Sequence, residues 1–294
     1  MTRNLAAALL LVACTPALAG SPWGQVRDTH PGPPEVIGGY AAGCLAGGAT
    51  LPLVGEGYQV MRPSRNRYYG HPRLVGFVKG LGREVSRRAW GRVLVGDLAQ
   101  PRGGPMDNGH RSHQSGLDVD IWFRLLPSAS PPLSREETEE TPMLSVVQVG
   151  EGALDGDRWA PRYAALIRLA AENPQVERIF VHPVIKQALC QTERDHDWLQ
   201  KVRPYWGHDA HFHVRLACPP DSPRCTAQDP APPGDGCDEG LDRWVEELRL
   251  AASIPKPTPP PAPRPALPSA CKAVLAGRPA LTTLGAVETP TRLR

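Results

Sequence analysis

The chain has 294 residues, of which 41% are hydrophobic, so it is long and apolar enough for one large domain or two small ones. Its formal net charge of +3 and its 6% of aromatic residues, which follow no basic–aromatic pattern, give no support for binding of RNA or DNA. After the N-terminal segment no apolar run is long enough to span a bilayer, and nothing in the composition indicates an oligomeric state.

The N-terminus has the pattern of an export signal. A basic residue precedes an apolar run over residues 5–12, and Ala17-Leu18-Ala19 supplies an Ala-x-Ala ending. Cleavage after Ala19 is the preferred interpretation; residues 1–19 are then a signal peptide and the mature protein is periplasmic. Residues 11–14 also resemble a lipoprotein cleavage box, and cleavage there would leave Cys14 lipidated at the new N-terminus.

Hydrophobic periodicity divides the rest of the chain into helices and strands. Residues 20–35 are rich in Gly and Pro and are expected to form a loosely ordered arm. Apolar spacing then predicts helices from residue 72 and over 157–172, 185–190 and 241–248, and strands over 92–97, 117–123, 176–181 and 211–216. Residues 126–142, rich in Pro, Ser and Glu, are expected to be a surface insertion. The pattern predicts a single α+β domain over residues 20–254, with a central antiparallel sheet flanked by helices and long loops.

Residues 255–294 form a proline-rich tail. The part from residue 255 to 268 is nearly polyproline, too stiff and too poor in apolar residues to build a second core. We therefore expect a strap across the domain, and we expect removal of everything after Lys272 to leave folding nearly intact.

Six of the seven cysteines remain once the signal is removed. An even number in an exported chain predicts three disulfides, but six cysteines permit fifteen pairings. Cys218 and Cys225 are the most plausible pair by proximity in the sequence. A structural zinc site built from cysteines is the alternative, although the chain has no Cys-x2-Cys knuckle.

The first group of candidate metal ligands lies around residues 113–120. Side chains alternate across a strand, so Asp118 and Asp120 share the face opposite the apolar residues of the segment 117–123. Gly116 allows a sharp turn that could fold His113 back over these carboxylates.

The second group lies in the strand expected over 211–216, where alternation places His211 and His213 on one face. Two imidazoles and a carboxylate are a usual donor set for a catalytic zinc, and one histidine is then left over as a general base or as a donor to the oxyanion. The alternative is that these are unrelated polar residues on half-exposed strands.

At these residues the chain resembles the penicillin-insensitive murein endopeptidases, zinc peptidases of the lysostaphin and D-alanyl-D-alanine metallopeptidase type. The shared pattern is His-x6-Asp followed by His-x-His, and the resemblance extends over roughly residues 36–272. The segments that carry it are 62–72, 116–122, 181–186 and 206–216, together with the positions of the cysteines.

The resemblance implies roles for individual residues. It makes His113, Asp120 and His213 the zinc ligands and His211 the catalytic histidine, with His208 beside the site. It allows His110 to belong to a second metal position, but residues 146–149 contain no carboxylate–histidine pair that would complete it. Asp118 is expected to orient a ligand or to form a hydrogen bond rather than to bind metal. The family resemblance also implies the disulfides Cys44–Cys271, Cys190–Cys237 and Cys218–Cys225, so that Cys271 tethers the tail.

The activity implied is hydrolysis of the D-alanyl–meso-diaminopimelyl cross-links of peptidoglycan, with Zn²⁺ as cofactor. A D-alanyl-D-alanine carboxypeptidase with the same zinc chemistry and a non-catalytic peptidoglycan-binding protein are the alternatives. Arg65, Tyr68 and Tyr69 have two interpretations: a polar loop anchored by aromatic rings, or the wall of a groove that meets peptide carboxylates.

Overall fold

The computed structural model describes residues 21–252, 263 and 265–278. The expected signal peptide, Cys14 and most of the proline-rich tail lie outside these residues. No helix in the described ranges combines the length and the apolar character that a bilayer span requires.

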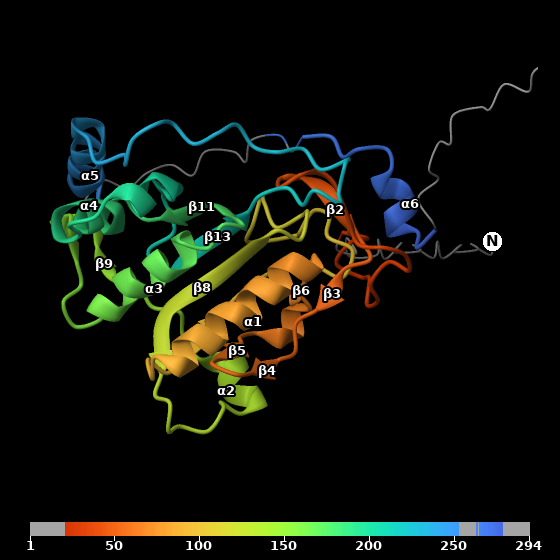
Figure 1. Cartoon of the computed structure of the whole chain (residues 1–294), viewed down its shortest axis with the longest axis horizontal. Coiled ribbons are helices and arrows are strands. Elements are labelled where there is room, and N and C mark those ends of the chain that lie inside the picture. Colours follow the sequence, from red (N-terminus) through yellow and green to blue (C-terminus); the bar gives the residue numbers. More distant parts are fainter. Residues whose placement is uncertain (1–20, 253–262, 264, 279–294) are drawn as a thin grey trace, which may run out of the picture.

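A seven-stranded sheet forms the centre of the fold (Figure 1). Its strand order is β12 (Val202–Pro204), β11 (Val176–Val181), β13 (His211–Leu216), β8 (Asp118–Leu126), β7 (Arg92–Val95), β5 (Tyr58–Val60) and β4 (Val54–Gly55). The helices around it are α1 (Pro72–Arg87), α2 (Arg135–Glu140), α3 (Pro161–Ala171), α4 (Pro183–Thr192), α5 (Glu239–Ala251) and α6 (Cys271–Leu275). The predicted α+β domain is confirmed.

The sheet is mixed rather than wholly antiparallel. The central pairs β11–β13, β13–β8 and β8–β7 are antiparallel, but β5 pairs with β7 in parallel and β12 pairs with β11 in parallel. A parallel pair needs a long crossover, and α1 lies between β5 and β7 while α4 lies between β11 and β12. The two strands that pair in parallel, β5 and β12, have only three residues each, which is too short to give an alternating pattern in the sequence.

One face of the sheet packs against the core, and the other carries polar side chains. Val119, Ile121 and Phe123 of β8 join the main apolar core with residues of α1 and α3, which lie side by side over the sheet (Figure 1). The alternate residues Asp118 and Asp120 point to the opposite face. The amphipathic pattern of the sequence therefore leaves the polar face of β8 free for a functional site.

Smaller elements complete the fold. Two-stranded sheets are formed by β1 (Glu35–Gly39) with β2 (Ala42–Ala46), β3 (Ala49–Thr50) with β6 (Tyr69–Gly70), and β9 (Val147–Gln148) with β10 (Ala153–Leu154). Three short 3-10 helices are η1 (Pro63–Arg65), η2 (Val149–Glu151) and η3 (Asp197–Lys201). The surface insertion contains α2, which begins with a capping box between Ser134 and Glu137.

The segment expected to be a loose arm is anchored instead. Trp23 is buried against Ile37, Cys44 and the tail residues Cys271 and Val274. Hydrogen bonds from Asn66 to the carbonyl oxygen of Val26 and from Arg102 to that of Asp28 hold the same segment. The expectation of a loose arm was wrong because Gly and Pro content does not show where a single aromatic residue packs.

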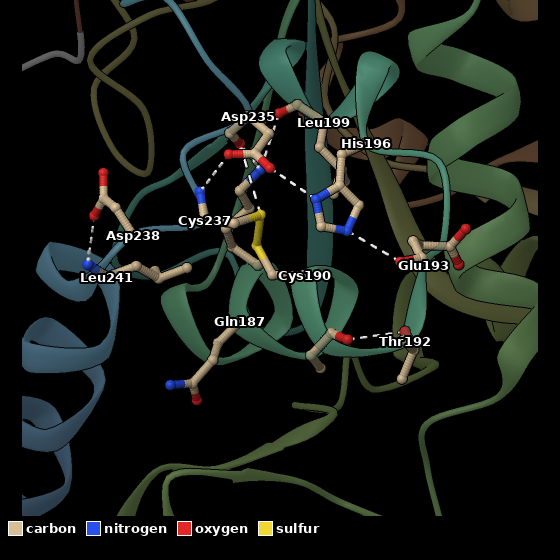
Figure 2. Close-up of a disulfide and its surroundings, with 12 residues drawn as sticks. Gln187, Cys190, Thr192, Glu193, His196, Leu199, Asp235, Cys237, Asp238 and Leu241 are labelled. Carbon is tan, nitrogen blue, oxygen red and sulfur yellow. Dashed lines mark hydrogen bonds and ion pairs between the residues drawn. A yellow bond between two sulfur atoms is a disulfide. The ribbon is translucent and has the colours of Figure 1, made fainter.

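The six cysteines form the three disulfides that the family resemblance implies: Cys44–Cys271, Cys190–Cys237 and Cys218–Cys225. The Cys44–Cys271 bond joins β2 to α6, close to the end of the described chain. The Cys190–Cys237 bond joins α4 to the segment that precedes α5 (Figure 2).

Candidate metal centre

The register of β13 and β8 brings the two sequence motifs together. His213 lies opposite Asp120, and Arg215 lies opposite Asp118. His211 is two residues before His213 and shares its face of the sheet. The predicted convergence of the two motifs is therefore a property of the fold.

His113 reaches the same face through a tight turn. Its φ is 64°, a left-handed conformation, and Gly116 has a φ of 74°. A Cβ on Gly116 would lie 2.6 Å from Cδ2 of Leu45, so the turn has no room for a side chain there. The backbone N–H of His113 donates to Oδ2 of Asp118 at 3.0 Å, which fixes the turn against β8.

Four imidazoles surround the carboxylate of Asp120. From its Oδ1, His213 Nδ1 is at 3.2 Å, His113 Nε2 at 3.4 Å and His211 Nε2 at 3.5 Å, while His110 Nε2 is 3.5 Å from Oδ2. Burial alone would raise the pKa of Asp120, but the histidines around it lower that pKa well below its usual range. Asp120 therefore remains a carboxylate at the centre of the cluster.

Several polar atoms in this cluster have no hydrogen-bond partner among the described residues. They include both ring nitrogens of His113 and Oδ1 of Asp120, all of them buried. Buried polar atoms are nearly always paired, so a converging set without partners is what residues prepared to hold a cation show. The donor set of imidazole and carboxylate fits zinc.

Both His110 and His213 lie close to the pair formed by His113 and Asp120. His110, His113 and Asp120 have ligand atoms within 4.8 Å of one another. His213 completes the set that the sequence predicts, since its ring centroid is 4.6 Å from that of His113. His110, which the sequence analysis assigned to a possible second metal position, thus lies within the same cluster as His113 and Asp120.

Asp118 and Arg215 form an ion pair that contacts the cluster through His213. Asp118 is fully buried, accepts from Nε of Arg215 at 2.8 Å and lies 3.0 Å from Nε2 of His213. Burial opposes ionisation of Asp118, but Arg215 and His213 lower its pKa below the usual range. The Arg215 guanidinium is in turn held between the rings of Tyr40 and Phe180, at 4.1 and 5.1 Å from their centroids.

His211 and His208 are placed on the open side of the cluster. Burial lowers the pKa of His211, and the other histidines lower it further, against the opposing effect of Asp120. The imidazole is therefore neutral near pH 7, as a general base must be. The ring of His208 is 5.1 Å from that of His211, beside the site as expected.

A cavity of about 50 Å³ opens directly onto these residues. Its lining includes His110, Asp120 and His211, and also Arg62, Arg65, Asp97, Trp122 and Met143. A second hollow of about 270 Å³ shares Trp122 and Met143 with it and is bordered by Arg124 and Arg158. Arg65 is thus at the site, whereas Tyr68 and Tyr69 stack on each other at 4.7 Å and line neither cavity.

Asp97 and Arg62 are parts of the site to which the sequence assigned no role. Oδ2 of Asp97 lies 3.0 Å from Nε2 of His110 and accepts from Arg67 at 2.9 Å and from Arg65 at 3.1 Å. Burial opposes ionisation of this carboxyl group, but the hydrogen bond with His110 and the arginine charges lower its pKa to about 2. The position of Asp97 as the last residue of the strand predicted over 92–97 was its only signal in the sequence.

The comparison with known proteins agrees with this geometry. Residues 36–276 match the family model described as penicillin-insensitive murein endopeptidase. A protein of that name from Yersinia enterocolitica is 44% identical over 281 residues, which cover 94% of this chain and 98% of the relative. Another of that name, from Escherichia coli O1:K1, is 42% identical over 288 residues, with 94% and 98% of the two chains covered. The chain therefore belongs to the penicillin-insensitive murein endopeptidase family of peptidases.

Proposed function

We propose that this protein is an exported, periplasmic zinc endopeptidase that hydrolyses the D-alanyl–meso-diaminopimelyl cross-links of peptidoglycan. The observation that carries the proposal is the convergence of His113, Asp120 and His213 in a buried cluster whose polar atoms lack partners among the described residues. Membership of the peptidase family, the disulfides and the open cavity beside the cluster support it.

His113, Asp120 and His213 would hold the metal, and His110, whose Nε2 lies 3.5 Å from Oδ2 of Asp120, is a further donor. A bound zinc would polarise the scissile carbonyl and lower the pKa of water towards neutrality. His211, neutral and facing the cavity, accepts the proton of the attacking water and returns it to the leaving nitrogen. Trp122 and Met143 line the cavity where the peptide backbone would pass.

Purified protein should be incubated with cross-linked muropeptide dimers and, in parallel, with monomers that carry a pentapeptide. The expected result is conversion of dimers to monomers, lost with chelator and restored by zinc. Release of D-alanine from pentapeptides without cleavage of dimers would identify a carboxypeptidase instead. Binding of both substrates without turnover by the zinc-loaded protein would leave a peptidoglycan-binding function.

A further inference from the structure

Two arginines reach the same small cavity as the metal cluster. Arg62 and Arg65 lie at the two ends of η1 and line the cavity together with Asp120 and His211. A group bound in this cavity would lie beside Asp120 and His211 and would meet both arginines.

The charge of Arg62 is not neutralised within the fold. Among the described residues, no carboxylate lies within ion-pair distance of its side chain, and the nearby Glu139 is engaged by Ser64 and Arg135. Burial and the adjacent Arg65 lower the pKa of Arg62, which means that the surroundings disfavour its charged form. A half-buried cation of this kind is stabilised when an anion binds beside it.

The orientation of Arg62 is suited to recognition. The carbon of its guanidinium lies over the ring of Trp122, 5.4 Å from the centroid. A guanidinium stacked on an aromatic face keeps its N–H edges free to bind a carboxylate in the plane. Trp122 and Arg62 both line the cavity.

Among the described residues, Arg65 is held in place through one nitrogen only. Its Nη1 donates to Asp97, and 40% of its side chain is exposed. Asp97 is already shared with Arg67 and His110, so one carboxylate faces three cationic or potentially cationic partners there. Arg62 and Arg65 therefore meet one lining carboxylate, Asp97, on their side of the cavity, and the other lining carboxylate, Asp120, belongs to the histidine cluster.

The loop that carries both arginines is fixed before any ligand arrives. Arg62 and Asn66 have left-handed φ values of 50° and 56°, conformations that need support from their neighbours. The N–H of Arg62 donates to the carbonyl oxygen of Thr138 at 2.9 Å, and Ser64 forms two hydrogen bonds to Glu139, at 2.6 and 2.8 Å. A site fixed in this way loses little entropy on binding.

We propose that Arg62 and Arg65 form a carboxylate subsite for the leaving-group side of the substrate, an inference that rests on the proposed function. In a D-alanyl–meso-diaminopimelyl cross-link, the scissile nitrogen is attached to a carbon that also bears a free carboxylate. This carboxylate is separated from the reacting carbonyl by only two atoms, so it fits a cavity that borders both Asp120 and the arginines. Guanidinium groups bind carboxylates through paired N–H donors.

The test compares two cross-linked peptides that differ at this one group, a free carboxylate or its carboxamide. Wild-type protein is expected to cleave the carboxylate form with kcat/KM higher by about 10- to 100-fold, as for loss of a charge-assisted hydrogen bond. Arg62→Gln should lose most of that preference, because its rate falls more on the carboxylate peptide than on the carboxamide, and Arg62→Lys should retain part of the preference. Arg87→Gln, on the exposed side of α1, is the matched control and should behave as wild type.

The ratio of kcat/KM on the carboxylate peptide to that on the carboxamide, measured for Arg62→Gln, tests the subsite. If Arg62→Gln cleaves both peptides more slowly by the same factor, Arg62 serves structure and the subsite is wrong. Zinc content and melting temperature, measured on each variant, show whether a variant has lost its fold.

Binding of the released product separates this inference from the proposed function. Calorimetry with the product peptide, as carboxylate and as carboxamide, needs no turnover. A preference for the carboxylate that is lost in Arg62→Gln would support the subsite even if the protein cleaved neither peptide. Equal affinities of wild-type protein for the two forms would overturn it even if the protein were an active endopeptidase.

Discussion

His213 lies directly opposite Asp120 between β13 and β8, with its Nδ1 3.2 Å from Oδ1 of that carboxylate. Its other ring nitrogen, Nε2, lies 3.0 Å from Oδ1 of Asp118. The imidazole is therefore placed between two carboxylates of β8, Asp120 in the candidate metal centre and Asp118 next to it. His211, two residues earlier, has no such support and faces the cavity.

This difference predicts separate effects for the two histidines. His211→Ala should keep nearly stoichiometric zinc but lose turnover of cross-linked dimers by about a hundredfold or more, as expected for loss of acid–base help. His213→Ala should lose the metal itself. Metal content by mass spectrometry and kcat on muropeptide dimers measure both effects, and an empty site in His211→Ala would contradict the assignment.

Asp118 should act on metal affinity through His213. A carboxylate beside the far nitrogen of a metal-binding histidine orients its ring, and loss of such support costs about 10- to 100-fold in metal affinity. Asp118→Asn keeps the shape but not the charge that pairs with Arg215 and His213. Competition with a chromophoric chelator should show weaker zinc binding, whereas Asp157→Asn, at an exposed position, should match wild type. Unchanged affinity in Asp118→Asn would rule out this support.

The structure moves the boundary of the removable tail. The sequence predicts that the chain can end after Lys272, but Val274 is fully buried and Arg102 donates to the carbonyl oxygen of Leu275 at 2.6 Å. Loss of a buried valine costs about 1.5–3 kcal/mol. Truncation after Arg278 should therefore leave the free energy of unfolding in urea unchanged, and truncation after Lys272 should lower it by about 2 kcal/mol. Equal free energies of unfolding for the two truncated proteins would show that the removable tail begins after Lys272, as the sequence predicts.

His196 should give one part of the fold a pH-dependent stability. Its Nδ1 lies 2.7 Å from Oδ2 of Asp235 and its Nε2 lies 3.0 Å from the carbonyl oxygen of Glu193 (Figure 2). Both nitrogens face acceptors, so the ring binds best as an imidazolium, and the hydrogen bond with Asp235 raises the pKa of His196.

Because this pKa is raised above the unfolded value, the stabilisation is fully present below the unfolded pKa and is lost as the pH rises through the folded one. Wild type should melt at a higher temperature than His196→Gln at about pH 5.5, and the difference should shrink by about pH 9. The pair is partly exposed, so the effect is small. A difference in melting temperature that is the same at both pH values would show that His196 contributes through packing alone.

The sequence by itself determined the elements and residue types on which the site depends. Alternation along 117–123 and 211–216 assigned Asp118, Asp120, His211 and His213 to polar strand faces, because side chains in a strand alternate with a period of two. Gly116 before the first strand indicated the turn that returns His113. These are local properties, and local spacing is what a sequence displays.

The tertiary structure decided which of these faces meet and what joins them. Only the register of β13 against β8 places His213 opposite Asp120, and the strands are separated by more than eighty residues of chain. Arg62 and Asp97 come from other elements and enter the site through the left-handed loop at η1 and the end of β7. Their contribution depends on contacts between residues far apart in the sequence. The anchoring of the N-terminal arm by the buried Trp23 likewise depends on such contacts, and local composition does not show it.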